Sequence, residues 1–354
     1  MRVDEHDPTV PFALGHVTLG NFAFEGLNNC YVLGLEPDAE TTLVDTGDAY
    51  PSTETELREG LAGLGVDFAD VDRVFLTHWH EDHTGLAGAI QAESGATVHV
   101  HEADAPLVAG DADAEAAMRE RMERLLAEWG MPDDSRDELL GFMDGAEAAG
   151  EHPEVTPFAD GDRFDIGSVT LEAVHLPGHA AGLAGFAFDT DRGVELASGD
   201  ALLPYYTPNV GGADVRVEGA LAAYLETLTG IVEADYARAW PGHRGAIVDP
   251  AGRAADIVAH HRERTERVVD VLRAGPADPW TVSAELFGDL SSIHILHGPG
   301  ESHAHLEHLE AAGVVASDAT DGGALTYELL ERDPDLDALF PDVGYAPEEL
   351  VADD

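Results

Sequence analysis

A nine-residue segment, THWHEDHTG at positions 77–85, concentrates side chains that can bind metal ions. Four potential ligands, His78, His80, Asp82 and His83, fall within six residues. In an extended segment, residues two positions apart point the same way, so His78 and His80 can face one ion. Asp82 and His83 follow after the chain bends, and they can face a second ion. Imidazole nitrogens with a carboxylate suit zinc, and also iron or manganese.

The segments on either side must hold these side chains in place. A mostly apolar run at 71–76 predicts a buried strand, and the Gly- and Ala-rich stretch 85–91 predicts the start of a helix. Before them, strand-like runs end at position 44, and leucines at helical spacing follow at 52–64. This alternation of strands and helices predicts an α/β fold with the metal-binding segment at a strand end.

With this cluster as a signature, the sequence resembles the metallo-β-lactamase-fold hydrolases, including the β-lactamase-like 2 and glyoxalase II-like members. Later segments look like the single-ligand loops of that family: LPGH at 176–179, ASGD at 197–200 and WPGH at 240–243. The resemblance implies one ion on His78, His80 and His179, a second on Asp82, His83 and His243, and Asp200 between them.

Two further features bear on the surroundings of the ligands. The strand at 41–44 ends in Asp45-Thr46-Gly47, and the resemblance implies that Asp45 supports the site through hydrogen bonds to ligands. After His179 come Ala180 and Ala181, where the family often has Thr or Ser. The group that orients His179 is therefore not predicted.

The resemblance also implies an overall architecture. Residues 1–250 are expected to form an αβ/βα four-layer sandwich with a helical insert at about 103–150. Residues 251–345 are expected to form a connecting helix and a winged-helix-like C-terminal unit, followed by an acidic tail at 346–354. That unit has neither Lys nor Arg between positions 275 and 331, which disfavours nucleic acid as its partner. We expect this C-terminal unit to be a scaffold or homodimer element that forms one wall of the active site.

The insert has two interpretations. Met118, Met122, Leu125 and Trp129 lie at helical spacings, so the segment is expected to be helical. In the first interpretation it is a surface hairpin that packs on its own fold. In the second it is a lid over the metals, in which Met122 and Trp129 contact substrate, because Met side chains adapt to apolar ligands.

The charge of the chain is extreme. It has 70 acidic and 18 basic residues, a formal charge of −52, and every basic residue is Arg. The acidic residues are spread along periodic segments that contain apolar residues, which favours a folded protein with an acidic surface over a disordered chain. In molar salt the Debye length is about 3 Å, which suppresses self-repulsion. The composition therefore indicates a protein from a high-salt cytoplasm.

Few features of the sequence bear on its cellular compartment or on membrane association. The single cysteine, Cys30, excludes an intrachain disulfide and lies in a strand-like run, where we expect it to be a core residue. The N-terminus lacks the pattern of a signal peptide, and no apolar run reaches 18 residues. These observations predict a cytoplasmic protein that does not span a membrane.

The predicted function is that of a dinuclear metal hydrolase acting on a small molecule. Two divalent ions, Zn²⁺ by preference with Mn²⁺ or Fe²⁺ as alternatives, would hold a bridging hydroxide and polarise the substrate oxygen. Asp82 would bind metal and orient that hydroxide or take up a proton. An ester, a thioester or a lactone is the expected substrate.

Three alternatives compete with this prediction. A metal-dependent endoribonuclease of the same fold would need a basic track for phosphates, and none is visible in the sequence. An iron oxygenase of the same fold would use one ion, which leaves the second ligand set unexplained. A winged-helix-type interaction module would have structural metals, but structural zinc sites are usually closed by four protein ligands.

Overall fold

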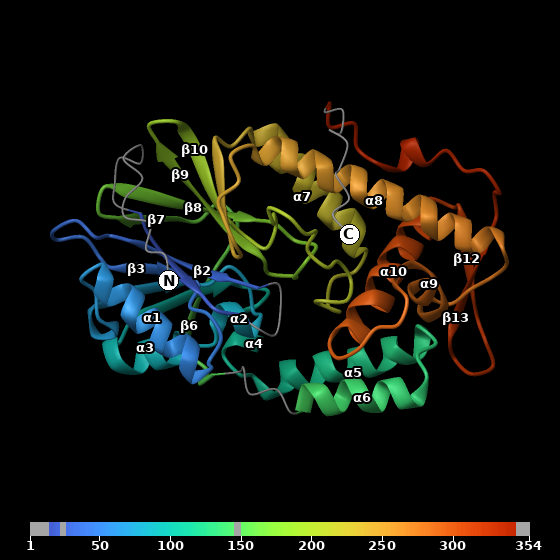
Figure 1. The fold of residues 1–354 in the computed structure, drawn as a ribbon, viewed down its shortest axis with the longest axis horizontal. Coiled ribbons are helices and arrows are strands. Elements are labelled where there is room, and N and C mark those ends of the chain that lie inside the picture. Colours follow the sequence, from blue (N-terminus) through green and yellow to red (C-terminus); the bar gives the residue numbers. More distant parts are fainter. Residues whose placement is uncertain (1–13, 22–25, 145–149, 345–354) are drawn as a thin grey trace.

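Two stacked β-sheets form the centre of the left half of the molecule in Figure 1; the computed structural model describes residues 14–21, 26–144 and 150–344. The first sheet has six strands in sequence order: β1 (Gly15–Leu19), β2 (Asn28–Leu33), β3 (Thr42–Val44), β4 (Arg73–Phe75), β5 (Thr97–His101) and β6 (Val155–Phe158). Strands β1 to β3 pair antiparallel and β3 to β6 pair parallel. The carboxyl ends of β3, β4 and β5 therefore meet at one edge of the sheet.

The second sheet has five strands in the order β11-β10-β9-β8-β7: β7 (Arg163–Ile166), β8 (Val169–His175), β9 (Ala184–Thr190), β10 (Gly193–Gly199) and β11 (Arg238–Pro241). Strands β7 to β10 pair antiparallel, whereas β11 is parallel to β10. An apolar layer joins the two sheets. In it, Phe75 contacts the ring edges of Phe164 and Phe186, with centroids 4.8 and 5.2 Å apart, a favourable geometry for aromatic pairs.

Helices cover the outer face of each sheet. Helices α1 (Pro51–Gly63) and α3 (Ala87–Ser94) pack on the first sheet, and α7 (Ala220–Ala234) and α8 (Pro250–Arg273) pack on the second. The leucines at helical spacing explain this packing, since Leu57 of α1 is fully buried. The predicted αβ/βα sandwich is confirmed.

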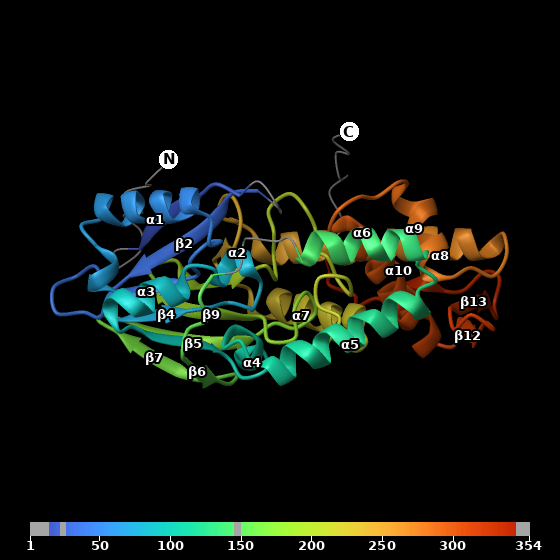
Figure 2. The same ribbon diagram turned by 90° about the horizontal axis from the view of Figure 1, so that it is seen from below.

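Three helices lie within the predicted insert: α4 (Ala105–Val108), α5 (Ala112–Glu128) and α6 (Asp133–Asp144). Two short helices, η1 (Phe68–Asp70) and α2 (Glu81–Thr84), precede it. Helix α5 begins at Asp111, whose carboxylate accepts hydrogen bonds from Asp113 N and Ala114 N. Helices α5 and α6 extend away from the sheets and lie beside α10, as both views show (Figures 1 and 2). The insert thus packs mainly on the C-terminal part of the chain.

The C-terminal part comprises α9 (Pro279–Phe287), α10 (His294–Ala311), β12 (Val315–Ala319), β13 (Leu325–Leu329) and η2 (Leu336–Leu339). Helix α8 runs from the second sheet into this unit (Figure 1), where Val268 and Leu272 share a core with Leu306 and Tyr327. The winged-helix description, the domain boundaries and the dimer role stay predictions, and the predicted acidic tail lies outside the described residues. Among those residues, the longest helices are too polar to cross a membrane.

Candidate metal centre

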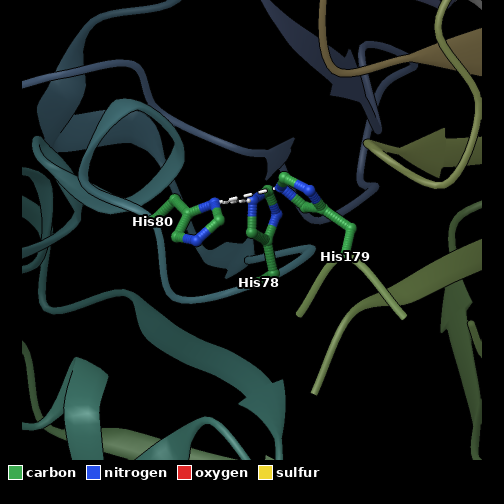
Figure 3. Close-up of side chains that lie close together, drawn as sticks. All are labelled: His78, His80 and His179. Atoms are coloured by element: carbon green, nitrogen blue, oxygen red, sulfur yellow. Dashed lines mark hydrogen bonds between the residues drawn. The ribbon is translucent and has the colours of Figure 1, made fainter. Parts of the chain in front are cut away.

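Three imidazole nitrogens converge at the edge where the two sheets meet. His78 and His80 follow β4, and His179 lies between β8 and β9. His80 Nδ1 lies 2.8 Å from His78 Nε2 and 3.1 Å from His179 Nε2 (Figure 3). All three side chains can offer one ligand atom to the same ion. We call them the first ligand group.

Hydrogen bonds at the far side of each ring determine which nitrogen has the proton. His80 Nε2 donates to Ala213 O at 3.0 Å, and His179 Nδ1 donates to Asn209 O at 2.8 Å. His78 Nδ1 lies 3.0 Å from Thr77 Oγ1, whose own proton goes to Asp45. Hence the three converging nitrogens all present lone pairs.

Lone pairs cannot satisfy one another by hydrogen bonding. Their convergence within hydrogen-bond distance therefore fits a cation between them. Neutral imidazole nitrogens are common ligands of divalent transition metals, and a hydrogen bond from the second ring nitrogen typically orients such a ligand. The donor set of the first ligand group fits a divalent ion.

The second ligand group consists of Asp82, His83 and His243, which can also offer ligand atoms to one ion. Asp82 Oδ2 lies 3.8 Å from His83 Nε2 and 3.4 Å from His243 Nε2. His83 Nδ1 donates to Asp45 Oδ2, and His243 Nδ1 donates to Gly26 O, each at 2.9 Å. When these two rings are neutral, both Nε2 atoms are therefore unprotonated, and their lone pairs face Asp82.

Asp200, at the end of β10, lies between the two groups. Its Oδ2 atom is 3.8 Å from His179 Nε2 in the first group and 3.6 and 3.3 Å from His83 Nε2 and His243 Nε2 in the second. Asp200 Oδ1 and His83 Nε2 are buried and have no hydrogen-bond partner among the described residues. Such unsatisfied buried atoms are costly, and a cation would satisfy both.

Glycine is needed where the ligand loops approach each other. A Cβ atom on Gly242 would lie 2.3 Å from Asp200 Oδ1 and 2.6 Å from His83 Cε1. The Pro-Gly-His loop before His243 can reach the site only because this position has no side chain. Gly178 serves a similar purpose, with φ of +136° and a Cβ position 2.5 Å from Tyr224 Cβ.

Local charges set the protonation of the two groups differently. Burial lowers the pKa of His78 and His179, and it lowers that of His80 to about 4, so the first group is neutral at pH 7. Burial also opposes charge on His243, but Asp200 and Asp82 outweigh it and raise its pKa to about 9. An ion at the second group must therefore compete with protons.

A network of hydrogen bonds and ion pairs that was not predicted from the sequence holds the ligand loops in position relative to each other. Asp104 accepts hydrogen bonds from Trp79 N at 3.0 Å and Gly182 N at 2.9 Å. Asp214 accepts from Trp79 Nε1 and Ala181 N, and Arg216 joins the two carboxylates with contacts of 2.6 Å. The loops that follow His78 and His179 are thus held by one buried network. No motif marks these residues, because their spacing in sequence is irregular.

A cavity of about 280 Å³ opens over the ligands. His80, Asp82, His179, Asp200 and His243 lie in its floor. Its walls are mainly apolar and come from the insert, from the 203–215 loop and from the start of α10: Met118, Met122, Phe142, Met143, Leu203, Pro208, Val215, Ile293 and Leu296. The predicted ligands in the floor thus face a cavity whose walls suit an apolar group.

The structure places the two residues that were predicted to contact substrate in different surroundings. Met122 lines the cavity, whereas Trp129 is 1 % exposed and packs in the core that joins the insert to α10. Trp129 is therefore placed behind the cavity wall. His294 and His297 at the start of α10 also line the cavity, and the sequence analysis did not anticipate them.

Comparison with known proteins identifies the family. The family model of the metallo-beta-lactamase superfamily matches residues 23–243, which is more than half of the chain. The chain belongs to the metallo-beta-lactamase superfamily. The resemblance found in the sequence is confirmed, and the matched range ends at His243, the last ligand predicted.

Relatives within the superfamily extend beyond the matched range. The chain is 24 % identical to a probable metallo-hydrolase of Bacillus subtilis over 82 % of this chain and 91 % of that protein. It is 25 % identical to an atrochrysone carboxyl ACP thioesterase of Paecilomyces divaricatus over 84 % and 74 % of the two chains. A metallo-beta-lactamase family protein of Thermus thermophilus shares the fold with a TM-score of 0.74 and 29 % identity, covering 89 % and 98 %. These relatives support a hydrolase.

Proposed function

We propose that the protein is a dinuclear, divalent-metal-dependent hydrolase that cleaves a thioester with an apolar acyl group. Oxygen esters and lactones of similar shape belong to the same reaction class. The observation that supports this proposal most directly is the convergence of two ligand groups, with Asp200 between them, in the floor of an apolar cavity. The thioesterase among the relatives favours sulfur as the leaving atom.

The residues of the two groups would each have a defined role. His78, His80 and His179 would hold one ion, and Asp82, His83 and His243 the other, with Asp200 shared. Nitrogen-rich ligation favours Zn²⁺, and the carboxylates also accept Mn²⁺ or Fe²⁺. Bound divalent ions would supply Lewis acidity toward the substrate carbonyl and lower the pKa of water at the site.

Hydrolysis adds water across the acyl carbon–sulfur bond. The carbonyl carbon gains the hydroxyl group, the carbon–sulfur bond breaks, and the thiol leaves with the other proton of water. Asp82 is positioned to take up that proton because its carboxylate lines the cavity. Asn21 and Asn28 donate to its Oδ2 atom at 3.2 Å each and thereby fix its orientation.

The apolar walls would bind the acyl group and exclude bulk water from the reacting carbonyl. Binding energy from a remote part of the substrate can be used to position the reacting bond. The Met side chains of the insert would adapt to acyl groups of different shape. We therefore expect faster turnover of thioesters with longer apolar acyl chains than of small polar ones.

Metal analysis together with a hydrolysis screen tests this proposal. Protein purified without chelator in strong salt should contain about two divalent ions per chain and should hydrolyse acyl thioesters. His80→Ala should lose metal and activity, whereas His308→Ala, whose ring donates to Leu339 O in the C-terminal part and lines neither cavity, should change neither. Full metal content and activity in the His80→Ala variant would remove His80 from the ligand set.

The same screen separates the alternatives. A reproducible single ion in an active preparation would favour the oxygenase. Cleavage of an oligoribonucleotide without thioester hydrolysis would favour the endoribonuclease. Two tightly held ions without any hydrolysis would favour an interaction module with structural metals.

A further inference from the structure

A second cavity, of about 480 Å³, adjoins the metal centre. It lies between the 205–209 loop, α8 and the start of α10, and we call it the Arg–Tyr cavity. Asn209, His294 and His297 line both this cavity and the apolar cavity over the ligands. The two cavities are therefore neighbours that meet at these three side chains. A substrate whose reacting bond lies at the ligands could extend into both.

The Arg–Tyr cavity differs in chemistry from the apolar one. Arg253, His260 and Arg264 of α8 line it, in a chain whose formal charge is −52. Burial, followed by the charges of Arg264, Arg253 and Arg267, lowers the pKa of His260 to about 4. The guanidinium groups thus act on His260, although Asp256 and Glu301 also line the cavity and balance the formal charge of Arg253 and Arg264. Guanidinium groups in a cavity attract anions.

Two nitrogens of the cavity wall are not satisfied by hydrogen bonds within the part of the chain that the structure describes. Arg264 Nε and His260 Nε2 are buried and have no hydrogen-bond partner among the described residues. Arg264 Nη1 pairs with Glu301, and Glu301 also accepts from Asn209 Nδ2 at 3.0 Å. Arg264 and Glu301 therefore compensate each other's charge. Asp256 is the other acidic group in the wall, and it could accept from an amide or hydroxyl of a ligand.

The rim of the cavity is aromatic. Tyr205 and Tyr206 are 75 % and 53 % exposed, unusually open for such large side chains. Arg244 lies over both rings, with its Cζ 6.0 and 5.1 Å from their centroids. Arg253 fixes this loop by donating to Leu203 O and Tyr206 O, each at 2.7 Å. Exposed rings beside guanidinium groups are suited to stacking and to phosphate recognition.

We infer that the Arg–Tyr cavity binds the phosphate-bearing part of a thiol leaving group while the apolar cavity holds the acyl group. This inference rests on the proposed thioester hydrolysis. A phosphate ester on the thiol is the chemistry shared by coenzyme A and by the phosphopantetheine arm of carrier proteins. Guanidinium groups bind phosphate through charge-assisted hydrogen bonds, and the amides of such a thiol would lie along the polar wall.

Thioesters that share one acyl chain but differ in the thiol test the inference. The holoenzyme in molar KCl is assayed with acyl-coenzyme A, acyl-4′-phosphopantetheine and acyl-pantetheine, which lacks phosphate. The wild type should show KM values lower by about tenfold or more for the two phosphate-bearing substrates. If acyl-phosphopantetheine equals acyl-coenzyme A, the contact is to the pantetheine phosphate; an advantage confined to acyl-coenzyme A places it on the nucleotide phosphates. Equal KM values for all three would overturn the inference.

Variants assign the effect to the cavity. Arg264→Gln should lose the phosphate advantage, measured as the ratio of the KM values for acyl-pantetheine and acyl-coenzyme A. Arg262→Gln is the matched control, because Arg262 lies on the same helix and pairs with Asp337 outside the cavity. If Arg264→Gln fails to fold, Tyr206→Ala changes only the exposed rim and should weaken the same substrates. A folded Arg264→Gln variant that keeps the advantage would contradict the assignment.

Calorimetric titration of the holoenzyme separates this inference from the proposed function, because it needs no turnover. Coenzyme A should bind, pantetheine should bind about tenfold or more weakly, and only Arg264→Gln should abolish the difference. This result would support the cavity even if thioester hydrolysis were absent. Tighter, Arg264-dependent binding of an oligoribonucleotide would make the cavity a nucleic-acid site and overturn the leaving-group assignment.

Discussion

The Oδ2 atom of Asp45 accepts hydrogen bonds from Thr77 Oγ1 and from His83 Nδ1, each at 2.9 Å. Thr77 in turn orients His78, so this one carboxylate fixes a ligand in each group. Asp45 itself has φ of +60°, a left-handed conformation that Asp and Asn tolerate better than most residues.

Replacing Asp45 with Asn should therefore remove the charge without straining the backbone. Asp45 accepts hydrogen bonds at both oxygens, from Thr77 N at Oδ1 and from Thr77 Oγ1 and His83 Nδ1 at Oδ2. The Asn amide has one acceptor oxygen and one donor group, so the bonds at one of these two positions are lost and the orientation of His78 or His83 is disturbed. We expect a decrease of about 10- to 100-fold in metal affinity or activity. Metal content after dialysis and kcat/KM measure it. Asp72→Asn, at a position that only caps Thr41 N, is the control. Unchanged metal retention in the Asp45 variant would show that its role is confined to the fold.

The convergence of the candidate ligands could be predicted from sequence because each lies after a strand within a short pattern that needs local geometry. The groups that orient them could not be predicted as well. His179 lacks the Thr or Ser neighbour common in the family, and its proton goes to Asn209 O. Every residue has a backbone carbonyl, so no sequence pattern marks the one that a fold brings into place. Arg216, Asp104 and Asp214 act through their side chains, and they escaped notice because their irregular spacing in the sequence forms no motif.

Enlarging the apolar cavity should change the acyl preference. Met118 and Met122 line it from α5, and their replacement by Ala removes contacts with the acyl chain while leaving the ligands in place. We expect the Met118→Ala/Met122→Ala variant to lose the preference for longer acyl chains and to keep its metal content. A series of thioesters of increasing chain length measures this. Arg124→Ala, on an exposed part of the same helix, should keep the parent's profile. An unchanged profile in the Met variant would exclude the insert from substrate binding.

Trp129→Ala should behave differently because Trp129 lies in the core behind the wall. Its loss should destabilise the protein by about 3–5 kcal/mol, as expected for a large buried aromatic side chain. Urea denaturation measures this change. Catalytic parameters of the folded fraction should stay near those of the wild type. A change in acyl preference with unchanged stability would place Trp129 in the substrate site instead.

Helical spacing was enough to predict helices in the insert, but not where they pack. Leu126 and Trp129 have the same apolar character whether they face the sheets or another helix. The structure places them against Leu296 of α10, more than 160 positions later in the sequence. Such contacts depend on the whole fold, which explains why two interpretations of the insert remained open. The cavity wall from α10 could not be predicted for the same reason.

The charge of −52 predicts a requirement for salt. At 0.01 M salt the Debye length is about 30 Å, so acidic groups across much of the surface repel one another. We expect the thermal unfolding midpoint to fall as salt is lowered from molar to millimolar concentrations. Circular dichroism at each salt concentration measures the midpoint. A midpoint that stays constant over this range would contradict the high-salt interpretation.

Acid should destabilise the protein through a buried histidine pair. His261 Nδ1 lies 3.3 Å from His305 Nε2 at the crossing of α8 and α10, and both residues are fully buried. Burial lowers the pKa of each well below the ordinary 6.5. Between that value and the lower folded value, the unfolded chain binds more protons. Stability is thus full above pH 6.5 and decreases as the pH falls below it.

Urea denaturation in strong salt from pH 7.5 to pH 5 tests this dependence. His305→Gln removes one proton-binding group from the unfolded chain, so the loss of stability toward low pH should be shallower than in the wild type. His152→Gln, which replaces a half-exposed histidine outside this pair, is the matched control. Equal slopes in the wild type and the His305 variant would show that other groups cause the acid sensitivity.

The position of α10 in the chain has a consequence for biosynthesis. All seven predicted ligands precede position 244, whereas Ile293, Leu296 and His297, which wall the cavities, come about 50 residues later. Because domains fold from the N-terminus during synthesis, the ribosome releases the predicted ligands and the insert before the α10 part of the cavity wall. For that interval a nascent chain has its predicted ligands beneath a cavity that is still open on the α10 side. The candidate metal centre and the closed cavity above it thus form at separate stages in the life of each molecule.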